Sequence, residues 1–128
     1  MLIVVAVAGL ALYGFLREGG NEHAEREVGL DSKEARAALA MFRQLSVSTN
    51  YLAQFLSPKA NPIAKRMLHQ RARQLSESTE VTLKQAAWSG DFLRVEILGV
   101  TKAGATNSHW FLLTEGEGGE LRLMGVQN

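Results

Sequence analysis

The amino-acid sequence predicts an α+β fold, in which a single transmembrane helix is followed by two to three helices packed on a curved, four-stranded antiparallel sheet. Three observations predict it. The chain opens with an uncharged apolar run, apolar residues then recur at helical spacing, and from residue 79 apolar and polar residues alternate. With 128 residues, the chain suits one domain with one core. We expect an anchor at residues 1–17, a polar tether at 18–30 and a helix-then-sheet domain at 31–128.

The opening run reads MLIVVAVAGLALYGFL and is followed by Arg17. As a helix, residues 2–16 would rise about 22 Å, short of a hydrocarbon core of about 30 Å, and a snorkelling Arg17 can extend the span. A cleaved signal peptide and a buried core helix are the alternatives. No basic residue precedes the run, no small-residue cleavage site follows it, and it has no polar stripe. These features favour a retained single-pass anchor.

The basic residues, which all come after the apolar run, predict on which side of the membrane the folded body lies. Because Lys and Arg near a span stay inside, the body is expected in the cytoplasm or a matrix-like space. A periplasmic body is the alternative.

Two helices are expected after the tether. Apolar residues at helical spacing predict the first over residues 31–56, with its amino-terminal cap at Asp31 or Ser32. Residues 46–50 are poor helix formers, so a kink or break is expected there. Both prolines follow this helix and separate it from a second one over residues 63–75.

The remainder of the chain reads as an antiparallel meander, since its apolar and polar residues alternate between short turns rich in Gly, Ser and Asp. Helices on one face of such a sheet would give a cone-shaped domain. The strands are expected over residues 79–88, 92–101, 109–114 and 120–127.

The residue types exclude several kinds of chemistry. The chain has no cysteine, so it has no disulfide, no thiolate nucleophile and no cysteine zinc site. Its three histidines are not at ligand spacing, and its glycines do not form a phosphate-binding loop. A net charge of +1 does not favour nucleic acid as a partner. We therefore expect no enzyme, no metal and no cofactor.

Two groups of residues are candidates for partner contact. On the second helix, basic residues share an arc opposite the apolar one, and they predict contact with an anionic membrane surface or another protein subunit. A solvated helix face is the simpler alternative. The members of this basic face are Lys65, Arg66, His69 and Arg73.

Aromatic residues of the sheet form the second group. They are either ordinary core residues or the lining of a pocket between the sheet and the helices. The members are Trp88, Phe92, Trp110 and Phe111.

Two segments carry a family resemblance: GDFLRVEILGV at residues 90–100 and LRLMGVQ at residues 121–127. With the apolar start and the helix-then-sheet order, they resemble the nuclear-transport-factor-2-like (NTF2-like) superfamily. Within it, the chain is most similar to the membrane anchor of the mitochondrial protein-import motor and its bacterial relatives. The inner-membrane bridge proteins of type IV secretion systems share the same plan with a periplasmic body. The resemblance implies a non-enzymatic module that holds partners at a membrane.

The sequence as a whole thus predicts a membrane-anchored interaction or scaffold module, which would be an accessory subunit of a larger membrane assembly. Oligomerisation of the chain is compatible with this prediction. Two alternatives stay open. One is a module that binds a small apolar ligand in the sheet–helix cavity, and the other is a secreted or periplasmic domain released by signal cleavage.

Overall fold

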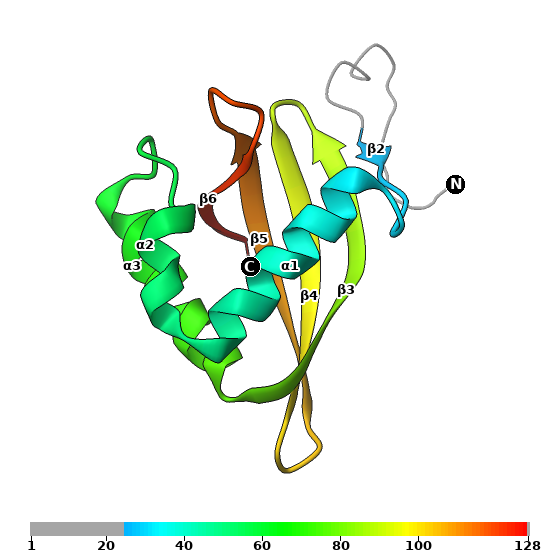
Figure 1. The fold of residues 1–128 in the computed structure, drawn as a ribbon, viewed down its shortest axis with the longest axis vertical. Coiled ribbons are helices and arrows are strands. Elements are labelled where there is room, and N and C mark those ends of the chain that lie inside the picture. The colour runs from blue at the N-terminus through cyan, green and yellow to red at the C-terminus, as the bar shows by residue number, and fades with distance from the viewer. Residues whose placement is uncertain (1–24, 128) are drawn as a thin grey trace.

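A computed structural model describes residues 25–127 of the chain (Figure 1). The chain forms helices first and most of the sheet afterwards. In order, the elements are β2 (Arg26–Glu27), α1 (Lys33–Val47), the 3-10 helix η2 (Thr49–Tyr51), α2 (Leu52–Phe55), α3 (Pro62–Ser76), β3 (Ser78–Ser89), β4 (Phe92–Thr101), β5 (Thr106–Glu115) and β6 (Leu121–Gln127).

Short polar side chains set where the helices begin and end. Ser32 caps α1, because its hydroxyl accepts a hydrogen bond from the Ala35 N–H at 3.1 Å. The helix ends at Val47, since Ser48 is extended and its hydroxyl accepts from the Asn50 N–H at 3.2 Å. The break expected among residues 46–50 is therefore present.

The second long helix, α3, has a strong start signal at its amino end. Its cap is Asn61, whose side-chain oxygen accepts from the Ala64 N–H at 2.7 Å, and Pro62 occupies the first turn. The helix covers the predicted residues 63–75 with one residue more at each end.

The sheet has five strands in the described part of the chain, in the order β2-β3-β4-β5-β6, and every neighbouring pair is antiparallel. The prediction of four strands is therefore wrong. The additional strand is β2, in which Arg26 lies opposite Trp88 and Glu27 opposite Ala87. Two exposed residues have no alternating pattern. Pairing with β3 makes them a strand, and it draws part of the predicted tether into the sheet.

The predicted transmembrane helix is also wrong for the chain as described, and with it the localisation as a single-pass membrane protein. Among residues 25–127, no helix has the length and the apolar character needed to cross a membrane. The two longest helices have 15 residues each, a rise of about 22 Å, and both carry charged side chains. Residues 1–17, where we expect the anchor, lie outside the described residues.

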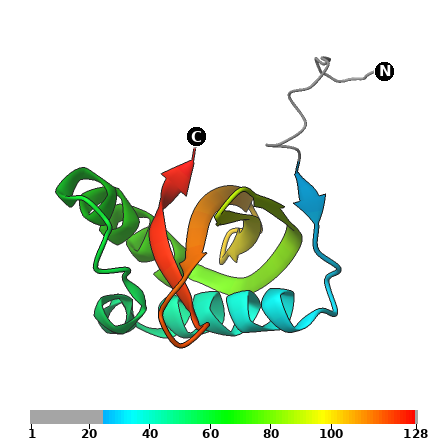
Figure 2. The same cartoon turned by 90° about the horizontal axis from the view of Figure 1, so that it is seen from above.

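The core lies between the helices and one face of the sheet. Figure 2 shows α1 running along one side of the sheet, with α3 beside β6. At the centre, Phe42 of α1 packs against Phe111 of β5 with ring centroids 4.5 Å apart, and both side chains are buried. The other fully enclosed large residues are Leu45, Leu52, Leu68, Leu75, Leu93, Val95, Ile97, Leu113 and Leu123.

Candidate functional site

The basic face of α3 is exposed along its whole length. The helix turns Leu68, Ala72 and Leu75 into the core, so the other side of the helix faces solvent. All four members of the predicted basic face are exposed there: Lys65, Arg66, His69 and Arg73.

These four side chains are not neutralised by the rest of the domain. None of them makes a hydrogen bond or ion pair with another side chain or backbone group among the residues described. The helix adds Arg71 as a further cation, and it carries no carboxylate from Pro62 to Ser76. Helix α3 therefore concentrates positive charge on a chain whose net charge is only +1.

One end of the basic face is hollowed. Thr49 of η2 lies against His69 and Arg73, which are one helical turn apart, and the three line a cavity of about 240 Å³. A hydroxyl, an imidazole and a guanidinium all supply hydrogen-bond donors, so this hollow suits a carboxylate or another small anionic group.

The predicted aromatic group is not gathered in one place. Phe111 is buried against Phe42, whereas Trp110, the preceding residue, points to the opposite face of the sheet, where the Arg94 guanidinium lies 4.8 Å from its ring centroid. Trp88 is half-buried at the edge of the core and lines a cavity of about 360 Å³ near the β3–β4 turn. Phe92 is 40% exposed.

A larger cleft lies between the α2–α3 loop and the β5–β6 hairpin, and the sequence did not point to it. It has a volume of about 710 Å³. The helical side contributes lysines and apolar residues, and the hairpin side, which we call the opposite wall, contributes glutamates. The lining residues are Ala53, Leu56, Ser57, Pro58, Lys59, Lys65, Thr114, Glu115, Gly116, Glu117, Glu120 and Arg122.

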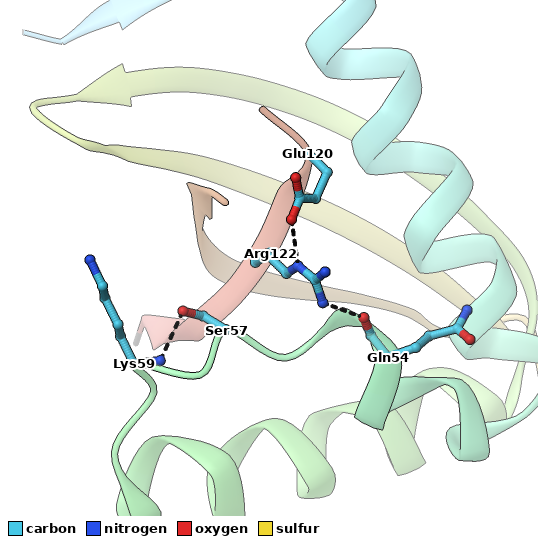
Figure 3. Close-up of polar contacts among 5 residues, drawn as sticks. All are labelled: Gln54, Ser57, Lys59, Glu120 and Arg122. Atoms are coloured by element: carbon cyan, nitrogen blue, oxygen red, sulfur yellow. Dashed lines mark hydrogen bonds and ion pairs between the residues drawn. The ribbon is translucent and has the colours of Figure 1, made fainter. Parts of the chain in front are cut away.

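Main-chain contacts hold the helical side of this cleft against the sheet. Leu56 forms a parallel bridge with Leu123, and the Ser57 N–H donates to the Leu123 carbonyl at 2.8 Å. The α2–α3 loop thereby covers part of the free edge of β6. Ser57 itself is buried, and its hydroxyl oxygen accepts from the Lys59 N–H at 3.1 Å (Figure 3).

Arg122 of β6 makes a second contact between the sheet and the helical side of the cleft. Its Nη1 donates to the Gln54 carbonyl oxygen at 2.7 Å, and its Nε donates to Glu120 at 3.1 Å (Figure 3). A hydrogen bond from its own backbone N–H, and next the bond from Arg122, lower the pKa of the Glu120 carboxyl. Glu120 is therefore ionised at neutral pH and compensates the charge of Arg122.

The hairpin wall depends on a tight turn. The Gly116 N–H donates to the Glu120 carbonyl at 2.7 Å, and Gly119 has a φ of 83°, a conformation that favours glycine. The turn brings Glu115 and Glu117 to the same cleft. The facing lysines, Lys59 of the α2–α3 loop and Lys65 of α3, lie far away in the sequence, and only the tertiary fold brings them near.

Two buried titratable groups lie in the sheet, but they face opposite ways. His109 points to the helices and Glu96 to the open face, because His109 pairs with Ile97 and Glu96 with Trp110 in the β4–β5 register. Burial, and next the nearby Arg71 charge, lower the pKa of His109, so its imidazole is neutral near pH 7. The two groups cannot share a proton, and they do not form an acid–base pair.

Glu96 is held by its neighbours on the open face of the sheet. Ser108 Oγ donates to its carboxylate at 2.5 Å and Gln85 Nε2 at 2.7 Å, and the Ser108 bond is the main reason that its pKa is lowered. Arg94 on the same face is bonded to Gln127 at 2.7 Å and paired with Glu25. The two charged residues of β4, Arg94 and Glu96, thus have partners within the domain.

No protein-family model matches the chain, and no curated protein matches it. A solved structure from Campylobacter jejuni, described as a "Putative NTF2-like transpeptidase", is similar over 72% of this chain and 97% of its own, with 11% sequence identity and a TM-score of 0.49. A likeness of that size assigns neither a family nor an activity. The resemblance to the NTF2-like superfamily and to its import-motor and secretion branches stays a prediction.

Proposed function

We propose that the chain is a binding module without chemistry of its own, which docks an acidic segment of a partner protein on the basic face of α3. One observation carries the proposal. Four cationic or imidazole side chains lie exposed on one helix, and none is paired within the described domain. They are Lys65, Arg66, His69 and Arg73.

The geometry suits an extended acidic peptide. From Lys65 to Arg73 the helix rises about 12 Å, which is the reach of about four residues of extended chain. The helix is capped and packed on the core along its other side, so the backbone positions that carry the exposed groups are fixed. An acidic side chain can enter the hollow beside Thr49, while others pair with Arg66 and Lys65.

A protein partner fits this surface better than nucleic acid. The chain as a whole has a net charge of only +1, whereas nucleic-acid binders combine a basic patch with a strongly basic total charge. The partner is proposed to be a subunit of a larger protein assembly, as the sequence resemblance implies, and no membrane contact enters the proposal.

The alternative of an apolar ligand between sheet and helices has less support. Its predicted lining residue Phe111 is 1% exposed and packs against Phe42, and Trp110 lies on the other face of the sheet. The space that such a ligand would need is occupied by side chains of the core.

Fluorescence anisotropy with a labelled peptide of alternating Glu and Ser would test the proposal. We expect binding that weakens as salt rises, because salt screens exposed charges. Arg66→Glu with Arg73→Glu should reduce affinity by about tenfold or more. The matched control is Lys33→Glu with Lys102→Glu, an equal charge change at two exposed positions elsewhere, and it should change affinity by less than about threefold.

Two results would contradict the proposal. Equal losses in both double variants would mean that only net charge matters. Equal affinity for a single-stranded oligonucleotide of the same charge would show a general preference for polyanions instead of an acidic protein segment.

A further inference from the structure

The cleft between the α2–α3 loop and the β5–β6 hairpin has the dimensions of a small-molecule site. Its volume of about 710 Å³ falls within the range of about 300–1,000 Å³ that is usual for ligand pockets. Two hydrogen bonds, from Ser57 to Leu123 and from Arg122 to Gln54, join the helical wall to β6. The hairpin wall is held by its own turn bond between Gly116 and Glu120. The cleft therefore exists before any ligand arrives.

Opposite charges stand on the two walls. Lys59 and Lys65 belong to the helical side, and Glu115 and Glu117 belong to the hairpin. Arg122 and Glu120 do not add to either wall, because they pair with each other. The other four side chains have no hydrogen bond or ion pair to any group within residues 25–127. Each wall thus keeps a net charge that the opposite wall does not neutralise by direct contact.

Two further features favour a carboxylate at the helical wall. Lys65 is near the amino end of α3, where the helix dipole is positive and where no acidic side chain is present. Ser57 is only 3% exposed, and its oxygen already accepts from the Lys59 N–H. Its hydroxyl proton donates to no group in the described structure, so this donor is free for an oxygen of a ligand.

The helical wall also carries apolar side chains. Ala53, Leu56 and Pro58 line the cleft there, and they suit the aliphatic part of a ligand. A dianion would be repelled by the glutamates of the hairpin, and a dication by the lysines of the helical wall. A ligand with one charge of each sign matches both walls.

We infer that this cleft binds a small zwitterion of the size of an amino acid to a tripeptide. Its carboxylate lies toward Lys59, Lys65 and the Ser57 hydroxyl, and its ammonium group lies toward Glu115 and Glu117. The site is separate from the acidic-segment site proposed above, except for Lys65, which borders both.

A titration of the ¹⁵N-labelled full chain with trialanine tests the inference. The expected result is a saturable shift of the amide signals of residues 57–59 and 115–120 at millimolar peptide. Acetyl-trialanine has lost the ammonium group and trialanine amide the carboxylate, so each should bind about tenfold or more weakly. Equal binding of either blocked peptide, or no shift with about 10 mM trialanine, would overturn the inference.

Substitutions in one wall at a time test whether both charges contribute to binding. Lys59→Gln and Glu117→Gln should each weaken trialanine binding by about fivefold or more, whereas the exposed controls Lys102→Gln and Glu77→Gln should leave it unchanged. The double exchange Lys59→Glu with Glu117→Lys should restore part of the binding, because the walls are again opposite in sign. If the double exchange binds no better than its single members, opposition of charge is not what selects the ligand.

The same titration separates this inference from the proposed docking function. Arg66 and Arg73 do not line the cleft, so Arg66→Glu with Arg73→Glu should leave trialanine binding intact while it weakens binding of the acidic peptide. Loss of trialanine binding in that variant would overturn the inference of a separate site.

Discussion

Replacing Phe42 by alanine would test whether the space between α1 and the sheet is a filled core or a ligand cavity. The side chain is fully buried, and its ring lies 4.5 Å from that of Phe111, centroid to centroid. Truncating a buried Phe to Ala costs about 3–5 kcal/mol. For a domain of about 100 residues, each kcal/mol corresponds to about 4–8 °C in melting temperature. Phe42→Ala should therefore lower the melting temperature by at least about 12 °C.

The ring pair itself is measured by a double-mutant cycle with Phe42→Leu and Phe111→Leu. An aromatic pair contributes about 0.5–1.5 kcal/mol beyond its burial, so the two losses should not add. Urea unfolding followed by circular dichroism gives the four free energies. Val47→Ala is the matched control on α1, since Val47 is 78% exposed and its replacement should stay within about 0.5 kcal/mol. A cost below about 1 kcal/mol for Phe42→Ala would refute the filled core and would favour an apolar ligand there.

Three further changes probe the fold by stability measurements. His109→Leu should abolish a pH dependence of the free energy of unfolding. The pKa of His109 in the folded state lies below the ordinary 6.5, so the wild type loses up to about 1.4 kcal/mol of stability per pH unit as the pH falls below 6.5. Equal slopes of stability against pH in both proteins would contradict this. Asn61→Ala removes the cap of α3 and should cost about 1 kcal/mol in urea unfolding, and an unchanged midpoint would show that the cap is dispensable. Arg122→Met breaks the tie to Gln54 and should cost about 1 kcal/mol, since the guanidinium is partly exposed, and a stabilised variant would contradict it.

Much of the fold was predictable because its signals are local. The cap at Ser32, the poor helix formers before Tyr51 and the prolines fix where the helices begin and end within a few residues. Alternation identified four strands, since each has one face on the core, as the buried Leu93, Val95 and Ile97 of β4 show. Each of these features depends on neighbours within a few residues of the same segment.

What the sequence missed depends on pairing between distant segments. Strand β2 consists of Arg26 and Glu27, and only contact with β3 makes these two residues a strand. The apolar opening run led to a membrane architecture that the described helices do not have. The charged cleft was missed for the same reason as β2: the loop near Lys59 and the hairpin near Glu117 meet only after the loop crosses the edge of β6.

The two proposed surfaces differ from the central strand of the open sheet face in how their charges are compensated. On the open face of the sheet, Arg94 is paired with Glu25 and Gln127, and Glu96 with Ser108 and Gln85. Those groups already have partners and gain little from a new one. The basic face of α3 and the walls of the cleft keep exposed charges that no described group compensates, so a partner of opposite charge adds contacts there without breaking existing ones. Function in this chain is therefore best sought where unpaired charges of one sign are grouped, as on α3 and on each wall of the cleft.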